Sequence, residues 1–227
     1  MNSSNNLKLK GIIPPILTPL RKDGKVDTIG LRNLTRHLIT CGVHGIFAMG
    51  TAGESPMLSR EQRRDALITI REESKGNVPL LVGIMETSTT RCLELVREAE
   101  EIGAEALVVN SPYYFHFSQA EIIKHCLAIK DATELPIVLY NIPKYTGNPL
   151  HVETINYLAR VPGVVAYKDS SSNMTQFQEV LRLTQDLPNF AVFQGNHLLS
   201  IPSLLIGASG IVPGVGNIIP KEMVGLY

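Results

Sequence analysis

The sequence predicts an α/β protein of the (β/α)8 barrel, or TIM barrel, class. Apolar, β-branched runs alternate along the whole chain with charged segments of helical period. The apolar runs are continuous, which is typical of parallel strands covered on both faces. About eight strand–helix units of roughly thirty residues each fit a closed barrel better than an open sheet.

The expected strands and helices follow one another in order. The strands are expected at residues 12–17, 45–49, 79–84, 106–109, 136–140, 164–167, 191–193 and 210–212, and the helices at residues 28–41, 59–75, 89–102, 118–132, 151–160 and 174–185. Two helices begin with capping boxes, Ser59 with Gln62 and Ser118 with Glu121. Residues 18–21 are not a glycine-rich phosphate loop, so a doubly wound fold is disfavoured.

The end of the sequence needs separate treatment. Residues 198–220 carry no charge and are about long enough to span a bilayer, but their prolines and glycines argue against a continuous helix. We expect a short buried helix followed by the strand at 210–212. Residues 220–223 resemble the first turn of the next helix. We therefore expect one barrel domain, residues 1–227, with its last outer helix truncated and apolar strand surface left uncovered.

Composition excludes several classes of function. Lys+Arg and Asp+Glu are 21 each, so no net field attracts nucleic acid or a membrane. Cys41, Cys92 and Cys126 have no zinc-binding spacing and are expected to be buried thiols of a cytoplasmic protein. The histidines are scattered, and we expect neither a metal nor a cofactor. The first ten residues are polar, unlike a signal peptide.

Lys168 is the first candidate catalytic residue. It follows an apolar run, residues 163–167, at the carboxyl end of a predicted buried strand, where barrel enzymes keep their active sites. Taken alone, such a lysine more often extends into water. Three other strand ends change this interpretation, because residues 50–55, 111–114 and 140–143 would place further polar groups at the same end of the barrel.

These groups suit carbonyl chemistry. A neutral lysine can attack a ketone, and the hydroxyls of Tyr140 and Thr51 can relay protons. Backbone N–H groups in the loop that contains Ala52 and Gly53 can hold a carboxylate. The apolar neighbours of Lys168 would lower the pKa of its amine. We expect these neighbours to be Val165, Ala166 and Val212.

With these motifs in this order, from residue 11 to residue 223, the chain resembles the dihydrodipicolinate synthase / N-acetylneuraminate lyase family of pyruvate-dependent class I aldolases. The resemblance implies that Lys168 forms a Schiff base with the C2 carbonyl of pyruvate or another 2-oxo acid. It implies that Tyr140 relays protons and that Thr51 is its hydroxyl partner.

The same resemblance implies an assembly. Tyr114 resembles the residue that reaches across a dimer interface into the neighbouring site, and Gly195 and Val212 resemble residues that line the pocket behind the lysine. Members of the family are expected to form homotetramers, as dimers of dimers, and to carry a C-terminal helical extension that we expect to be missing here.

The chain departs from the family at positions expected to select the second substrate. The dihydrodipicolinate-forming branch usually has Thr-Thr in place of Thr51-Ala52 and an arginine in place of Tyr145. An arginine binds a carboxylate bidentately, which a phenol cannot do. Lys144 is adjacent, but in an extended chain it would point the other way. The sialic acid branch has acidic residues near the position of Asn196.

The preferred function is therefore cleavage of a 2-keto-3-deoxygluconate-type substrate to pyruvate and an aldehyde. The alternatives are 4-hydroxy-tetrahydrodipicolinate synthase, which uses pyruvate and aspartate semialdehyde, and N-acetylneuraminate lyase. A catalytically silent barrel acting as sensor or scaffold is the non-enzyme alternative. A phosphate-binding isomerase is disfavoured, because residues 214–217 match its loop only weakly. The expected partners are small 2-oxo acids and aldehydes, with no nucleic acid and no membrane.

Overall fold

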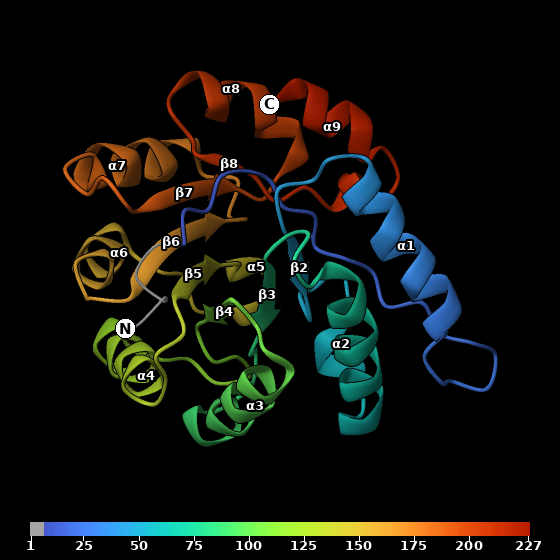
Figure 1. Ribbon diagram of the computed structural model, residues 1–227. Helices are drawn as coiled ribbons and strands as arrows, with labels where there is room; N and C mark the ends of the chain where they lie inside the picture. Colours follow the sequence, from blue (N-terminus) through green and yellow to red (C-terminus); the bar gives the residue numbers. More distant parts are fainter. Residues whose placement is uncertain (1–6) are drawn as a thin grey trace.

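The computed structural model describes residues 7–227 and shows eight parallel strands in a barrel with helices packed around it (Figure 1). The hydrogen-bonded order is β1-β8-β7-β6-β5-β4-β3-β2. The remaining gap, between β1 and β2, is closed by a parallel bridge between Pro15 and Phe47. There the Phe47 N–H donates to the Pro14 carbonyl and the Ile16 N–H donates to the Phe47 carbonyl, each at 3.0 Å. The predicted barrel is confirmed.

Each strand overlaps an expected run, but the first strand shares only Ile12 with the run expected at residues 12–17. The strands are β1 Gly11–Ile12, β2 Ile46–Ala48, β3 Leu80–Gly83, β4 Ala106–Asn110, β5 Ile137–Asn141, β6 Val164–Asp169, β7 Ala191–Gln194 and β8 Gly210–Ile211. The largest extension is in β6, which continues through Lys168 to Asp169 because both residues still pair with β5 and β7. The candidate lysine therefore lies inside a strand.

The six expected helices are also present. They are α1 Thr28–Thr40, α2 Arg60–Ser74, α3 Thr89–Ile102, α4 Gln119–Asp131, α6 Val152–Ala159 and α7 Met174–Thr184. Shorter helices are α5 Pro143–Thr146, α8 Ser200–Leu205 and α9 Pro220–Leu226, with 3-10 turns η2 Ser55–Met57, η3 His197–Leu199 and η4 Gly214–Asn217. Both predicted capping boxes, Ser59 with Gln62 and Ser118 with Glu121, are confirmed.

Alternate strand residues face two apolar layers. In β5, Leu139 packs in the layer between the sheet and the helices, whereas Val138 and Tyr140 face the layer inside the barrel. Both layers are buried, which explains why each strand is a continuous run of apolar residues in the sequence. Side chains at the carboxyl ends of the inner faces therefore converge on the barrel axis.

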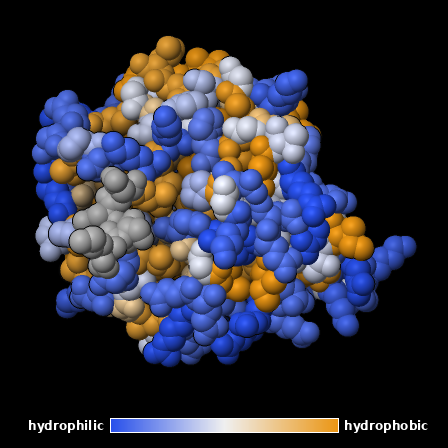
Figure 2. All heavy atoms as spheres, viewed as in Figure 1, coloured by the Kyte–Doolittle hydropathy of each residue, from blue (hydrophilic) through white to orange (hydrophobic). Residues whose placement is uncertain are grey.

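The uncharged segment 198–220 is divided among η3, α8, β8 and η4. The expectation of a buried helix there was wrong, because Leu198 is 78% exposed and Leu205 is 81% exposed. The helix contributes small residues such as Ser203 to the core instead. Figure 2 shows apolar residues gathered on the surface over α8 and α9.

Helix α9 follows β8 at the place expected for the eighth outer helix (Figure 1). Its residue Met223 packs with Ile12 of β1 and Ile211 of β8, and both isoleucines are fully buried. The seam between the first and last strands is therefore covered. None of the helices within residues 7–227 is long and apolar enough to cross a membrane. The expectation about the first ten residues rests partly on residues 1–6, which lie outside the described part of the chain.

Closure of the barrel generates a stability prediction at Gly210. A Cβ atom there would overlap the backbone carbonyl of Gly11 in the paired strand, so one backbone must move. Gly210→Ala should lower the free energy of unfolding by about 1–3 kcal/mol. The matched control is Gly214→Ala, where a Cβ meets no atom within 4 Å and the change should stay within about 0.5 kcal/mol. Urea unfolding measures both, and equal stability of the two variants would contradict the prediction.

Candidate active site

Strand register places two predicted catalytic residues side by side. Lys168 of β6 pairs with Tyr140 of β5 on one side and with Phe193 of β7 on the other. The Lys168 amine lies 3.9 Å from the centroid of the Tyr140 ring and 4.9 Å from that of Phe47. Only 5% of Lys168 is exposed. The amine is therefore enclosed by aromatic surface inside the barrel.

A β-bulge at the start of β6 sets this register. Ile137 pairs with Val164, but Val138 pairs with Ala166, so Val165 is the extra residue. Beyond the bulge, Ala166 packs inside the barrel on the same strand face as Lys168. Because side chains alternate along a strand, a slip of one residue would turn the lysine away from the barrel interior.

Burial lowers the pKa of the Lys168 amine. The Tyr140 hydroxyl and the Asp169 carboxylate act in the opposite direction, but desolvation is the largest effect. The amine lines a small apolar cavity with Val212 and Phe193. The direction expected from the sequence is confirmed, and the neutral, nucleophilic form of the amine is favoured compared with an exposed lysine.

The Tyr140 hydroxyl connects the lysine to the loop that follows β2. It lies 3.5 Å from the Thr51 Oγ1 atom, at the outer limit of a hydrogen bond. Tyr140 is buried, and its ring meets the ring of Phe47 edge to face at 6.1 Å. The two predicted relay hydroxyls are therefore brought together beside the amine.

The loop after β2 presents free backbone donors. The N–H groups of Thr51, Ala52 and Gly53 have no acceptor within residues 7–227, whereas Glu54 N–H donates to the Thr51 carbonyl at 3.1 Å. Consecutive free N–H groups in a turn form a site for an anion. This arrangement supports the prediction that the loop can bind a carboxylate.

A buried carboxylate next to the lysine was not predicted from the sequence. Asp169 is fully buried, and its Oδ1 accepts hydrogen bonds from the Asn141 side chain and the Tyr167 hydroxyl, both at 2.9 Å. Its Oδ2 accepts from the Ser171 N–H at 3.2 Å and from the Ser171 hydroxyl at 2.8 Å. Burial raises the pKa of Asp169, and these donors oppose the rise. The carboxylate ties β5 to β6 and to the next loop. The available signal was the polar run that follows Lys168.

Two predicted residues are exposed. Tyr114 is 84% exposed and adopts a positive φ of 85°. Tyr145 is 60% exposed and lies in α5. The prediction that Lys144 points away from Tyr145 was wrong, because it required an extended chain. The chain is helical there, and the Lys144 amine lies 5.4 Å from the centroid of the Tyr145 ring.

The residues after β7 lie near the lysine. A Cβ on Gly195 would overlap the Ser170 hydroxyl and come within 3.0 Å of the Lys168 Cε atom, so only glycine fits there. Asn196 is engaged at both ends of its amide. Its Nδ2 donates to the Ser172 hydroxyl at 2.9 Å, and its Oδ1 accepts from the Leu198 N–H at 3.0 Å.

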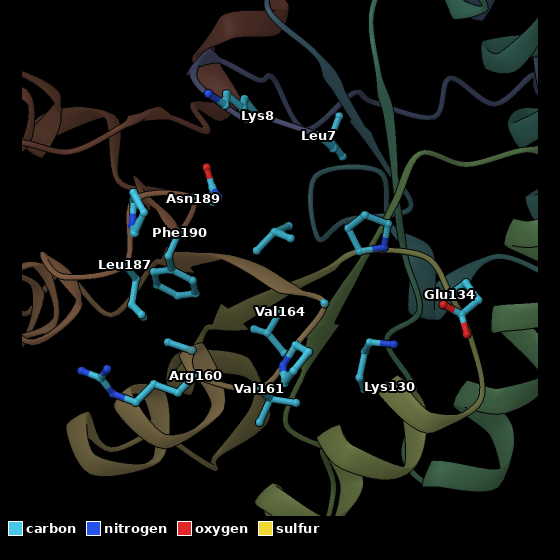
Figure 3. A pocket seen from close by; sticks show the side chains of 16 residues that line it. Leu7, Lys8, Lys130, Glu134, Arg160, Val161, Val164, Leu187, Asn189 and Phe190 are labelled. Atoms are coloured by element: carbon cyan, nitrogen blue, oxygen red, sulfur yellow. The ribbon is translucent and has the colours of Figure 1, made fainter. Parts of the chain in front are cut away.

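A surface hollow lies at the opposite end of the barrel (Figure 3). It is lined by residues that precede β5, β6 and β7, including Pro136, Gly163 and Phe190. Two of its charged side chains already have partners, because Lys130 donates to the Thr133 carbonyl at 2.9 Å and Arg160 pairs with Asp186 at 2.8 Å. Conserved chemistry in barrels of this class sits at the other end. Within residues 7–227, no cluster of metal-binding side chains is found.

Comparisons with known proteins agree with this geometry. Residues 8–227 match the Dihydrodipicolinate synthetase family. The chain is 35% identical over 221 residues to a 4-hydroxy-tetrahydrodipicolinate synthase of Methanothrix thermoacetophila, which covers 96% of this chain and 74% of that protein.

Solved structures give the same result. The 2-keto 3-deoxygluconate aldolase from Picrophilus torridus superposes with a TM-score of 0.89 at 35% identity, covering 96% of this chain and 78% of that one. The dihydrodipicolinate synthase from Bacteroides thetaiotaomicron superposes with a TM-score of 0.91 at 39% identity, covering 96% and 74%.

The lowered pKa of Lys168 can be tested by pH-dependent acetylation with acetic anhydride, followed by mass spectrometry of peptides. The midpoint of labelling at Lys168 should lie below the ordinary lysine value of 10.5. In Tyr140→Phe it should fall further, because the phenol hydroxyl favours the charged amine. Labelling of the exposed Lys221 in the same digest corrects for reagent loss. A midpoint at or above 10.5, or an upward shift in Tyr140→Phe, would be the contrary result.

Proposed function

Because this chain belongs to the Dihydrodipicolinate synthetase family, we propose that it is a class I aldolase that forms a Schiff base between Lys168 and a 2-oxo acid. One observation carries the proposal. The Lys168 amine is buried, its pKa is lowered, and it lies against Tyr140, which contacts Thr51. A neutral amine next to a hydroxyl relay is what imine formation requires.

In the proposed reaction the neutral Lys168 amine adds to the C2 carbonyl, and loss of water leaves a protonated imine. The imine accepts the electron pair of the C3–C4 bond while the C4 hydroxyl loses its proton, which releases the aldehyde. The Tyr140–Thr51 pair moves this proton and those of the addition step. Protonation of the enamine at C3 and hydrolysis of the imine release pyruvate and restore the amine.

The carboxylate of the 2-oxo acid is proposed to bind the free N–H groups of Thr51, Ala52 and Gly53. Ala52 contributes no hydroxyl, but its N–H remains available. This position places the C2 carbonyl near Lys168, because Thr51 contacts Tyr140 and Tyr140 contacts the amine. Binding of the adjacent C1 carboxylate thereby orients the C2 carbon that the amine attacks.

We further propose that Tyr114 completes the site of a second copy of the chain, within a homotetramer. The exposure of its side chain supports this role. Tyr114 and Phe115 are both exposed, and their ring centroids lie 5.0 Å apart, so the two rings are available to contact a partner. Aromatic side chains are enriched at such interfaces.

The preferred substrate is a 2-keto-3-deoxygluconate-type sugar acid. A phenol, Tyr145, stands where a bidentate cation would bind a second carboxylate, and the amide of Asn196 is already engaged. The aldehyde product is then expected to be uncharged. The similarity to the 2-keto 3-deoxygluconate aldolase of Picrophilus torridus supports this choice.

The second candidate is 4-hydroxy-tetrahydrodipicolinate synthase, and the position of Lys144 favours it. Its amine lies over Tyr145, so a positive charge is present close to the position of the missing arginine. An ammonium binds a carboxylate as a point charge and with less geometric specificity than a guanidinium. The name of the relative from Methanothrix thermoacetophila points in the same direction.

Borohydride reduction in the presence of pyruvate tests the chemistry. A stable adduct of pyruvate should form on Lys168, as located by peptide mass mapping. Lys168→Arg should form none, because a guanidinium stays protonated. Tyr140→Phe should slow adduct formation roughly 100-fold through loss of the proton relay. An adduct on a different lysine, or none on folded protein, would reject the mechanism and favour a silent barrel.

A comparison of aldehydes tests the substrate. The chain should cleave 2-keto-3-deoxygluconate faster than it condenses pyruvate with aspartate semialdehyde. Tyr145→Arg should raise kcat/KM for aspartate semialdehyde about tenfold, because it adds a bidentate partner for the second carboxylate.

The matched variant for this comparison is Lys144→Gln, which removes the neighbouring charge and keeps Tyr145. It should leave cleavage of the sugar acid unchanged. A clear preference of the unaltered chain for aspartate semialdehyde, lost in Lys144→Gln, would instead support the second candidate.

A further inference from the structure

The loop that follows β2 adopts an unfavourable backbone conformation. Met49 and Glu54 have positive φ values of 56° and 57°, which non-glycine residues rarely adopt. Such conformations persist only where the surroundings impose them. One restraint is the Thr18 hydroxyl, which donates to the Gly53 carbonyl at 2.9 Å from the β1 side of the loop.

The second restraint comes from a buried arginine on α2. Arg63 Nη1 donates to the Ser55 hydroxyl at the end of the loop, and its Nη2 donates to the Gly83 carbonyl at 3.4 Å. Ser55 and Arg63 are both buried. One guanidinium therefore joins the loop after β2 to the end of β3, on the helix side of the sheet.

The charge of Arg63 is balanced behind the loop. Its Nε lies 3.7 Å from the Glu98 Oε2 atom, and neither atom has a hydrogen-bond partner in the described part of the chain. Burial lowers the pKa of Arg63, while the charges of Glu98 and Glu86 oppose this shift. A buried ion pair with such imperfect geometry is a weak source of stability. Its hydrogen-bond partners are the Ser55 hydroxyl and the Gly83 carbonyl.

We propose that Arg63 is a positioning residue for carboxylate binding. By holding Ser55, it fixes the loop so that the N–H groups of Thr51, Ala52 and Gly53 stay free and directed to one anion. The inference rests on the proposed function, and it adds a residue outside the barrel that controls affinity for the 2-oxo acid. Lys168 lies on β6, and within residues 7–227 no hydrogen bond or ion pair joins it to Arg63.

The test separates carboxylate binding from the chemistry of the amine. The variant Ser55→Ala removes the hydroxyl that Arg63 holds and keeps the charge pair intact. Borohydride trapping on Lys168 is then measured with two probes: pyruvate, which has a carboxylate, and acetaldehyde, which has none. The pyruvate concentration for half-maximal trapping should rise about tenfold, the size expected for loss of a hydrogen bond to a charged group. Trapping of acetaldehyde should change less than about twofold.

The matched control is Ser74→Ala, on α2, the helix that carries Arg63. Ser74 is fully buried, and its hydroxyl has no partner within residues 7–227. This variant should leave both probes unchanged. Arg63→Lys keeps a charge opposite Glu98, but one ammonium cannot reproduce the guanidinium fork. Like Ser55→Ala, it should raise the pyruvate concentration for half-maximal trapping and leave trapping of acetaldehyde unchanged. Thermal unfolding is recorded for every variant, to detect loss of the fold.

The outcomes separate this inference from the proposed function. Suppose that the unaltered chain traps pyruvate. If Ser55→Ala and Arg63→Lys then trap pyruvate at normal concentrations, or if their trapping of pyruvate and of acetaldehyde falls equally, the positioning role is overturned. If the unaltered chain traps acetaldehyde on Lys168 but shows no saturable trapping of pyruvate, carboxylate binding by the loop is overturned with it. If it traps neither probe, the proposed function itself fails.

Discussion

The desolvation of the Lys168 amine is the constraint on which the site depends. Each unit by which the pKa falls corresponds to about 1.36 kcal/mol against the charged form. The rings of Tyr140 and Phe47 oppose this, since cation–π contacts stabilise the ammonium by about 0.5–2 kcal/mol each. The pKa is lowered because desolvation outweighs the opposing effects of the Tyr140 hydroxyl and the Asp169 carboxylate. The aromatic rings stabilise the protonated amine in an apolar barrel, and they would stabilise the cationic imine of the proposed reaction in the same way.

Phe47 connects closure of the barrel to this desolvation. Its backbone forms the bridge to Pro15 that closes the gap between β1 and β2. Its ring lies near the amine and meets the ring of Tyr140, and a Cβ on Gly50 would come within 2.9 Å of it. A barrel that opened between β1 and β2 would therefore admit water to the amine and release the start of the loop that carries the free N–H groups. Fold stability and chemistry share one side chain here.

The sequence could predict most of this fold because its signals are local. Continuous apolar runs gave the strands, and capping boxes gave helix starts, to within a few residues. The bulge at Val165 was not predictable, since both neighbouring residues are valines or alanines that suit either face. The helical turn at Lys144 was missed because an extended chain was assumed after the strand, whereas Pro143 is the first residue of α5. Asp169 and Arg63 were missed because their partners, Asn141 and Ser55, lie 28 and 8 residues away, and only the tertiary fold brings them together.

The site separates its charges according to what each must do. A cation beside Lys168 would bind the substrate's carboxylate, but that carboxylate is absent in the free protein, and the cation would then be a buried charge without a partner. Backbone N–H groups avoid this cost, because they attract an anion without a net charge. The charge that shapes them, on Arg63, lies on the other side of the sheet and is balanced by Glu98. In the proposed function, a carboxylate is held next to an amine of lowered pKa because the loop's conformation is fixed from outside the barrel.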